Sequence, residues 1–196
     1  MQSTKDKILS AVISHIKGGN NLEHMTISKI ANEAEIGKST VYEHFSSKEE
    51  MISETYQYLL DHYDSILSAD HQKMGFKDAF IEQIRRVLMV MKDAKQIMSA
   101  IMNFDQETFV SYGKHLEKSA ESIRLKIQER FKSIIYVGAI EGIISPKMPP
   151  NPHIGSVIQA IVSGLLFQYV NGAIEIEEDD LCELIYHQVL LAIKDS

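Results

Sequence analysis

The chain has 196 residues, which suits one domain or two closely packed ones with a substantial apolar core. Hydrophobic residues make up 44% and charged residues 24%, as is ordinary for a globular protein. The net charge of −7 excludes binding to nucleic acid through a strong basic field. Residues 1–48, however, hold six lysines against five acidic residues, whereas residues 49–196 hold 14 basic and 22 acidic residues, so the first part is the less acidic.

The compartment follows from what the sequence lacks. A single cysteine, Cys182, excludes an intrachain disulfide and fits a reducing environment. The opening residues MQSTKDK lack the apolar segment of a signal peptide. No stretch approaches the roughly 18 uninterrupted apolar residues of a membrane span. We therefore expect a cytoplasmic protein with no membrane partner.

Three short helices are predicted at the N-terminus. The first runs from Thr4 to Lys17, with Ser3 and Asp6 spaced as its cap. Thr26 is placed to cap the second, whose apolar stripe consists of Ile27, Ile30, Ala31 and Ala34. After a break at residues 36–37, residues 38–44 form a third helix. Two brief helices joined by a tight turn are typical of a helix-turn-helix motif.

The outer face of the third helix is polar. It carries Lys38, Ser39, Thr40, Tyr42 and His44, with Lys48 just beyond. These side chains are donors of the kinds that reach phosphate oxygens and base edges in a major groove of DNA. The simpler alternative is a face that is only solvated.

The stretch AEIGKSTVYEHFSSK resembles the signature of the TetR family of bacterial transcriptional regulators. The residues that match this signature are Ala34, Lys38, Thr40, Tyr42, His44, Phe45 and Lys48. Glu35 departs from it, because the family usually has glycine in this turn. A glutamate forced to a positive φ there would be strained by about 1–2 kcal/mol.

The resemblance implies a role for each polar residue. Lys38, Tyr42 and Lys48 would hold phosphates, and the amide end of the second helix, with Thr26 and Ser28, would hold another. Ser39, Thr40 and His44 would then contact base edges.

The rest of the chain is predicted to be helical throughout. We expect a helix from Lys48, opened by a capping box of Ser47 and Glu50, to about Ser68. Further helices are expected over residues 76–91, 93–103, 105–142, 152–170 and 179–194, with Asn151 and Pro152 opening the fifth of these. Residues 154–170 are apolar on nearly all sides, so this helix must be covered, and a second copy of the chain could cover it.

The fold class expected is therefore all-α, with a helix-turn-helix DNA-binding domain over residues 1–47 and a helical bundle over 48–196 for ligand binding and dimerisation. The resemblance implies a homodimer joined by a four-helix interface, which binds a palindromic operator in double-stranded DNA and is released by a small-molecule effector. For the interface we expect Ile154, Ile158, Ile161, Leu165, Leu181, Leu184, Ile185 and Val189.

The effector site is predicted from composition. Five of the nine methionines lie between Met74 and Met102, and methionine adapts to apolar ligands of varied shape. The expected lining residues are His62, Phe80, Ile84, Leu88, Met98, Met102, Phe109, Tyr112, His115 and Phe167. Ordinary core packing is the alternative reading for each apolar residue, and an exposed surface position for each histidine.

Other classes of protein have less support. The sequence contains no HExxH, GxSxG or phosphate-binding glycine loop, and its eight histidines are scattered, so we expect no enzyme, no metal site and no cofactor. A helical adaptor that uses its first helices for protein contacts remains the alternative to a DNA-binding repressor.

Overall fold

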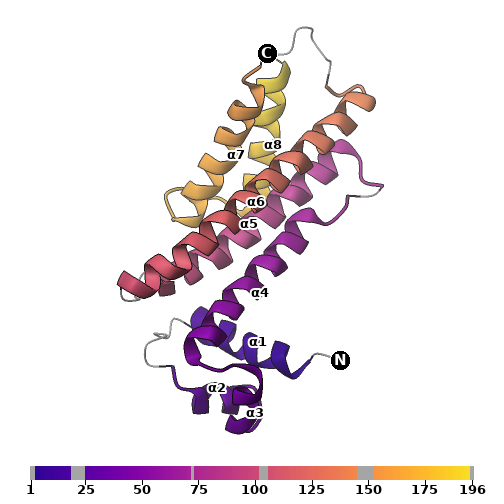
Figure 1. The fold of residues 1–196 in the computed structure, drawn as a ribbon. Coiled ribbons are helices and arrows are strands. Elements are labelled where there is room, and N and C mark those ends of the chain that lie inside the picture. Colours follow the sequence, from indigo (N-terminus) through magenta and orange to yellow (C-terminus); the bar gives the residue numbers. More distant parts are fainter. Residues whose placement is uncertain (1–2, 19–24, 72, 102–105, 145–151, 195–196) are drawn as a thin grey trace. The chain divides into compact units, whose positions relative to one another are not determined.

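The computed structural model describes residues 3–18, 25–71, 73–101, 106–144 and 152–194, without the side chains of residues 96–120. Every regular element in these ranges is a helix, which confirms the all-α prediction (Figure 1). The elements are α1 (Thr4–Lys17), α2 (Ile27–Glu33), α3 (Lys38–His44), α4 (Lys48–Ser68), α5 (Phe76–Ile101), α6 (Gln106–Ile140), α7 (Ile154–Val170) and α8 (Glu178–Lys194).

Two predicted helix boundaries need correction. The helices expected over residues 76–91 and 93–103 are a single helix, α5, because neither Lys92 nor Asp93 is a residue that breaks a helix. In α7 the N-cap is His153, so Pro152 precedes the helix instead of opening it. The predicted cap Asn151 lies outside the described residues.

The chain divides into two compact units. Unit 1 consists of Met1–Ser65 and Asp93–Ser122, and unit 2 of Ile66–Lys92 and Ile123–Ser196. These units follow spatial contacts and do not coincide with the predicted functional border at residue 48, which stays a prediction.

Unit 1 has its core where α1, α2 and α3 meet the first turns of α4. The buried side chains of α1 are those of the predicted stripe, including Ile8 and Val12, neither of which is exposed at all. A capping box fixes the start of α1, because the Ser3 hydroxyl accepts from the amide of Asp6 while the Asp6 carboxylate accepts from the amide of Ser3. The capping box and the buried apolar stripe therefore both match the helix predicted from the sequence.

Unit 2 is built around an aromatic cluster. The ring of Phe80 lies 5.4 Å from that of Phe131 and 5.8 Å from that of Tyr186, and Phe76 lies 5.7 Å from Tyr186, measured between centroids. These offset and edge-on contacts join α5, α6 and α8. At the surface, ion pairs connect α5 to α8: Lys77 with Glu183, Arg85 with Asp179 and Lys92 with Glu178. The pairing order shows that the two helices run antiparallel.

A glycine permits the close approach of α6 to the start of α5. Gly138 is buried, and a Cβ added there would lie 2.8 Å from Cδ2 of Phe76 and 2.9 Å from Cδ1 of Ile144. Neither neighbour can move away freely, because both belong to the buried core.

We predict that Gly138→Ala destabilises the protein by about 1–3 kcal/mol through overpacking. The sign is informative, because the same change in an open helix stabilises by about 0.5–1 kcal/mol. Urea unfolding followed by circular dichroism measures the change. Gly155→Ala in α7 is the control, since an added Cβ there meets nothing within 4 Å. A Gly138→Ala variant at least as stable as wild type would contradict this account.

Candidate nucleic-acid interface

We call residues 1–47, with helices α1 to α3, the head. Its second helix, α2, is fixed at its start by a side chain. The hydroxyl of Thr26 accepts a hydrogen bond from the amide of Lys29 at 3.2 Å, as its position predicts. Met25 and Ile30, which hold the N′ and N4 positions of a hydrophobic staple across this cap, are both buried. The two contacts direct the chain into α2.

The turn between α2 and α3 has a defined hydrogen-bond pattern. The amide of Ile36 donates to the carbonyl of Ala31 at 2.9 Å, and the amide of Glu35 donates to that of Asn32 at 3.1 Å. This pair of bonds is a Schellman motif, in which Glu35 occupies the left-handed position with φ of 57°. The strain anticipated for this glutamate is therefore present.

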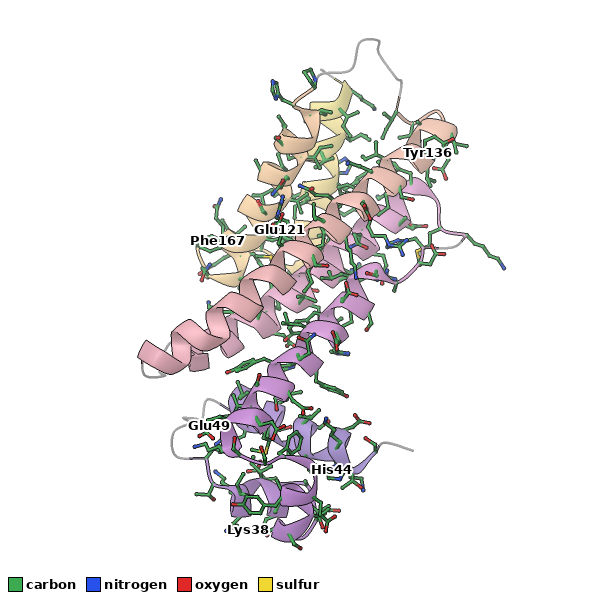
Figure 2. The ribbon with its side chains drawn as sticks, viewed as in Figure 1. Lys38, His44, Glu49, Glu121, Tyr136 and Phe167 are labelled. Carbon is green, nitrogen blue, oxygen red and sulfur yellow. The ribbon has the colours of Figure 1, made fainter. Side chains whose placement is uncertain are left out.

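Helix α3 is held from one side only. Val41 is completely buried, and Phe45, which ends the helix, is 2% exposed. Because these residues anchor the inner face, the opposite face points outward, and Lys38, Ser39, Tyr42 and His44 are all exposed. Figure 2 shows Lys38 and His44 on this helix. The predicted polar face is thus an accessible surface.

Within that face Lys38 and Tyr42 interact. The ammonium nitrogen of Lys38 lies 6.0 Å from the centre of the Tyr42 ring, at the outer limit of a cation–π contact. Tyr42 is 53% exposed, so its hydroxyl is available to a ligand. Thr40 and Lys48 are half-buried at the edges of the face, and Thr26 and Ser28 are exposed at the start of α2.

The junction of α3 and α4 is bonded differently from the predicted capping box. The Ser47 hydroxyl accepts from the amide of Glu50 as expected, but the Glu50 carboxylate accepts from the amide and hydroxyl of Ser46. These bonds lower the pKa of Glu50, the Ser46 side chain contributing most. The carboxylate is therefore ionised and ties the end of α3 to α4.

Sequence reasoning missed Glu43, which is exposed on α3 one turn after Ser39. Its position on the helix was the available signal, since residues four apart share a face. A carboxylate there repels phosphate, and it can accept a hydrogen bond from the amino group of a cytosine.

Among the side chains that the structure describes, the residues predicted for an effector site belong to both units and differ in burial. Phe80, Ile84 and Leu88 are completely buried in the core of unit 2, while Phe167 is 62% exposed on α7. His62 is exposed in unit 1. Four other predicted lining residues have side chains outside the described set, and Met102 lies outside it entirely; the four are Met98, Phe109, Tyr112 and His115.

The residues predicted for the dimer interface also need revision. Leu181, Ile185 and Val189 are at most 1% exposed and belong to the core of the protomer, so they present no surface to a partner. Three more are partly buried against that core, namely Ile158, Ile161 and Leu165, and Ile154 is half-buried. Only Leu184, at 36%, is exposed. A helix periodicity finds the apolar positions but does not say which protomer covers them.

Two features are absent from the residues that the structure describes. None of the helices there is both long and apolar enough to cross a membrane. Over the same ranges, no group of three or more histidine, cysteine, aspartate or glutamate side chains is arranged to hold a metal ion.

Comparison with protein families gives one match for the head. Residues 20–55 match the family model described as bacterial regulatory proteins, tetR family. The matched segment contains α2, the turn at Glu35, α3 and the start of α4. No curated protein matches the chain.

Solved structures match over nearly the whole length. A transcriptional regulator from Rhodococcus sp. is 16% identical, with a TM-score of 0.63 and coverage of 98% of this chain and 97% of that one. A TetR transcriptional regulator from Streptomyces coelicolor is 18% identical, with a TM-score of 0.59 and coverage of 96% and 97%. A TetR transcription regulator from Haloarcula marismortui is 14% identical, with a TM-score of 0.59 and coverage of 98% and 97%. At these identities the likeness concerns the fold.

The fold and the exposed face of α3 define a helix-turn-helix DNA-binding regulator with an all-helical body. The head matches the tetR family model over residues 20–55, and the chain shares its fold with solved TetR regulators over nearly its whole length. Proteins of this class regulate transcription and are not enzymes.

We predict that Glu35→Gly raises the free energy of unfolding by about 1 kcal/mol, because glycine adopts a positive φ without strain. Glu35→Ala is the matched control, since it removes the same charge but keeps a Cβ. Urea unfolding should give the gain for glycine and little change for alanine. Equal effects of the two substitutions would show that charge, and not backbone conformation, is responsible.

Proposed function

We propose that the protein is a homodimeric repressor that acts in the cytoplasm, binds a palindromic operator through two α3 helices and leaves it when a small apolar effector binds. The observation that carries the proposal is the exposed polar face of α3, anchored from behind by Val41 and Phe45. In this view residues 1–47 are the reading domain and residues 48–196 serve ligand binding and dimerisation.

Each side chain of the α3 face has a role in the proposal. Lys38, Tyr42 and Lys48, with the amides and hydroxyls of Thr26 and Ser28, contact phosphates. Base edges are contacted by Ser39, Thr40 and His44, and Glu43 adds a preference for cytosine.

The weak charge of the head makes a dimer necessary. With six lysines against five acidic residues in residues 1–48, electrostatic attraction to DNA is small. Two heads that enter major grooves about 34–36 Å apart double the contacts and require a two-fold symmetric site. Linking the two binding events can raise affinity by about 10²–10⁴ over one head.

The outer faces of α7 and α8 support dimerisation. On α7 an exposed or half-buried stripe of apolar and small residues follows helical spacing: Val157, Ala160, Gly164 and Phe167. On α8 the exposed Leu184 and Leu191 are spaced by seven residues. An added Cβ at Gly164 would meet nothing within 4 Å, which leaves space for a close helix partner. This face replaces the one predicted from periodicity, with Leu184 common to both.

The proposed release of DNA by an effector must meet a thermodynamic condition. An effector releases DNA only if it binds better to a state whose head separation does not fit the operator. An apolar ligand is favoured by the methionine and aromatic content of α5 and α6. Native mass spectrometry of protein purified from cells, compared before and after organic extraction, would detect such a ligand.

The operator is tested by selection of bound sequences from a random duplex library, followed by gel shifts at several salt concentrations. We predict that wild type selects a palindrome. Lys48→Ala should weaken binding to all duplexes by a similar factor. It should also reduce the slope of log affinity against log salt concentration by about one, because one phosphate contact is lost. Thr40→Ala and Ser39→Ala should cost about 1–3 kcal/mol at particular base pairs and relax the selected sequence there.

Glu49→Ala, on the exposed start of α4, is the control for general effects of truncation near the head. Equal losses on operator and random DNA for Lys48, Thr40 and Ser39 would contradict the assigned roles. Failure of the wild type to select any sequence would overturn the proposed function and favour a helical adaptor.

The proposed dimer face is tested by placing a charged side chain on it. We predict that Phe167→Glu raises the dissociation constant of the dimer at least about 100-fold, because two uncompensated carboxylates would be buried. Sedimentation velocity measures this. Tyr136→Glu is the matched control, since Tyr136 is equally exposed, at 67%, but lies on α6 away from Phe167 (Figure 2). A dimer that survives Phe167→Glu and dissociates with Tyr136→Glu would place the interface on α6.

A further inference from the structure

The connection between α4 and α5 is bonded by side chains of the helices beside it. Nη1 of Arg86 on α5 donates to the carbonyl of Ala69 at 2.7 Å. A guanidinium nitrogen of Arg130 on α6 donates to the carbonyl of Ser68, and its Nη1 lies 3.9 Å from the carboxylate of Asp70. All of these residues belong to unit 2. Two arginines of the same unit therefore hold the chain where α4 ends.

His71 lies in this connection and contacts one of the two arginines. Its Nε2 is 3.2 Å from Nη1 of Arg86. A guanidinium carries only donors, so this contact is a hydrogen bond only when Nε2 has a free lone pair and the imidazole is neutral. The backbone of His71 is bonded as well: its amide donates to the Asp70 carboxylate at 2.8 Å, and its carbonyl accepts from the amide of Met74 at 3.0 Å. The neutral ring thus completes a set of bonds that runs through the connection.

The backbone of the connection is strained. Lys73 has a φ of 71°, in the left-handed region that is unfavourable for a residue with a Cβ. Both Lys73 and Met74 are exposed, so apolar packing contributes little to holding them in place. The bonds made by the surrounding side chains therefore provide much of what keeps the connection closed.

The charged groups around the imidazole include both signs. Arg86 and Arg130 are the cations, and Glu82 on α5 and Asp70 in the connection are the anions. Glu82 is itself paired with Nε of Arg86 at 2.9 Å. Burial of the ring, followed by the charges of the two arginines, lowers the pKa of His71 against the opposing effect of the carboxylates. A protonated ring would be a third cation in this half-buried group, and it would lose its bond to Arg86.

We propose that His71 is an acid-sensitive latch: the neutral imidazole holds the connection between α4 and α5 closed against Arg86, and protonation opens it. The proposal concerns unit 2 alone and does not depend on the proposed function.

The direction of the pH effect follows from linkage. In an opened connection the ring of His71 takes up a proton near its ordinary pKa of about 6.5, whereas in the closed connection its pKa is lower. The closed state is therefore most stable above about pH 6.5. It loses stability as the pH falls from there to the lower pKa of the closed state, and it changes no further below that value.

Hydrogen exchange followed by mass spectrometry tests the latch on the intact protein, at about pH 7.5 and about pH 5.5. The reporter is the peptide that contains the amides of His71 and Met74. The quantity compared is its protection factor, which corrects for the change of intrinsic exchange with pH. We expect protection in the wild type to fall at least about threefold at the lower pH. In His71→Gln it should be the same at both, because the amide oxygen can accept from Arg86 and does not titrate.

His187→Gln is the matched control. The side chain of His187 belongs to the same unit and is 62% exposed on α8, where it lies 3.6 Å from the carboxylate of Glu183. Its removal should leave the fall in protection at the connection unchanged. A second measurement follows the latch residue itself. In Arg86→Met, the NMR titration midpoint of His71 should rise toward the ordinary histidine value, because a neighbouring cation is lost.

Four results would overturn the latch. One is a wild-type connection whose protection does not change between the two pH values, and another is a His71→Gln variant with the same fall as wild type. A third is an equal loss of protection throughout unit 2, because it would report general unfolding in place of local opening. The fourth is a titration midpoint of His71 that does not move in Arg86→Met, since the imidazole would then not be held against that arginine.

Discussion

The structure depends on how the two ends of α4 are bonded. At its start, Ser47 caps the helix and the Glu50 carboxylate accepts from Ser46, so the entry from α3 is fixed by charge-assisted hydrogen bonds. At its end, the side chains of Gln83, Arg86 and Arg130 donate to the carbonyls of residues 67–69 in place of a glycine turn. A helix held at both ends by side chains can be released at either end by moving those side chains, whereas a glycine turn depends on nothing outside itself.

The helix ends of this chain show how one motif can be stable or strained. The turns after α2, α6 and α7 each have the same pair of closing hydrogen bonds and a residue of positive φ. Two of these residues are Gly142 and Gly172, and the third is Glu35 in the DNA-binding head. The strain at Glu35 is local and small, yet it falls in the turn that sets the angle between α2 and α3. A family pattern alone identifies the departure, and only the observed φ of 57° shows that the backbone keeps the geometry that glycine would allow.

Much of the fold could be predicted, because its signals are local. Ser3 and Asp6 mark the start of α1 and Thr26 marks that of α2, and all three were found from spacing alone. The continuity of α5 was missed, since a change in the apolar stripe near Lys92 resembles a break while no residue there is a helix breaker. His15 of α1 was also missed: it is 4% exposed and lies 3.7 Å from the Glu33 carboxylate, a contact between two helices.

The parts that could not be predicted involve contacts between distant residues. Arg130 donates to the carbonyl of Ser68, 62 residues away in the chain, and no periodicity in the sequence predicts that contact. The interface residues failed for a related reason: Leu181, Ile185 and Val189 are apolar at the correct spacing, but each helix of a bundle has an apolar face toward its own chain. A surface can be proposed for a second copy only after the protomer core has been assigned, when Phe167 and Leu191 are left exposed.

The charge distribution explains why positioning matters so much in this protein. A strongly basic head would bind DNA in many registers, and a change in its orientation would alter affinity little. Here residues 1–48 are nearly neutral and the remainder is acidic, so under the proposed function affinity would come from a few oriented contacts of α3, made once by each protomer. In that proposal a misoriented head would lose contacts at its half-site, and attraction from the acidic remainder of the chain would not compensate. The proposed binding is thus sensitive to geometry because charge contributes so little to it.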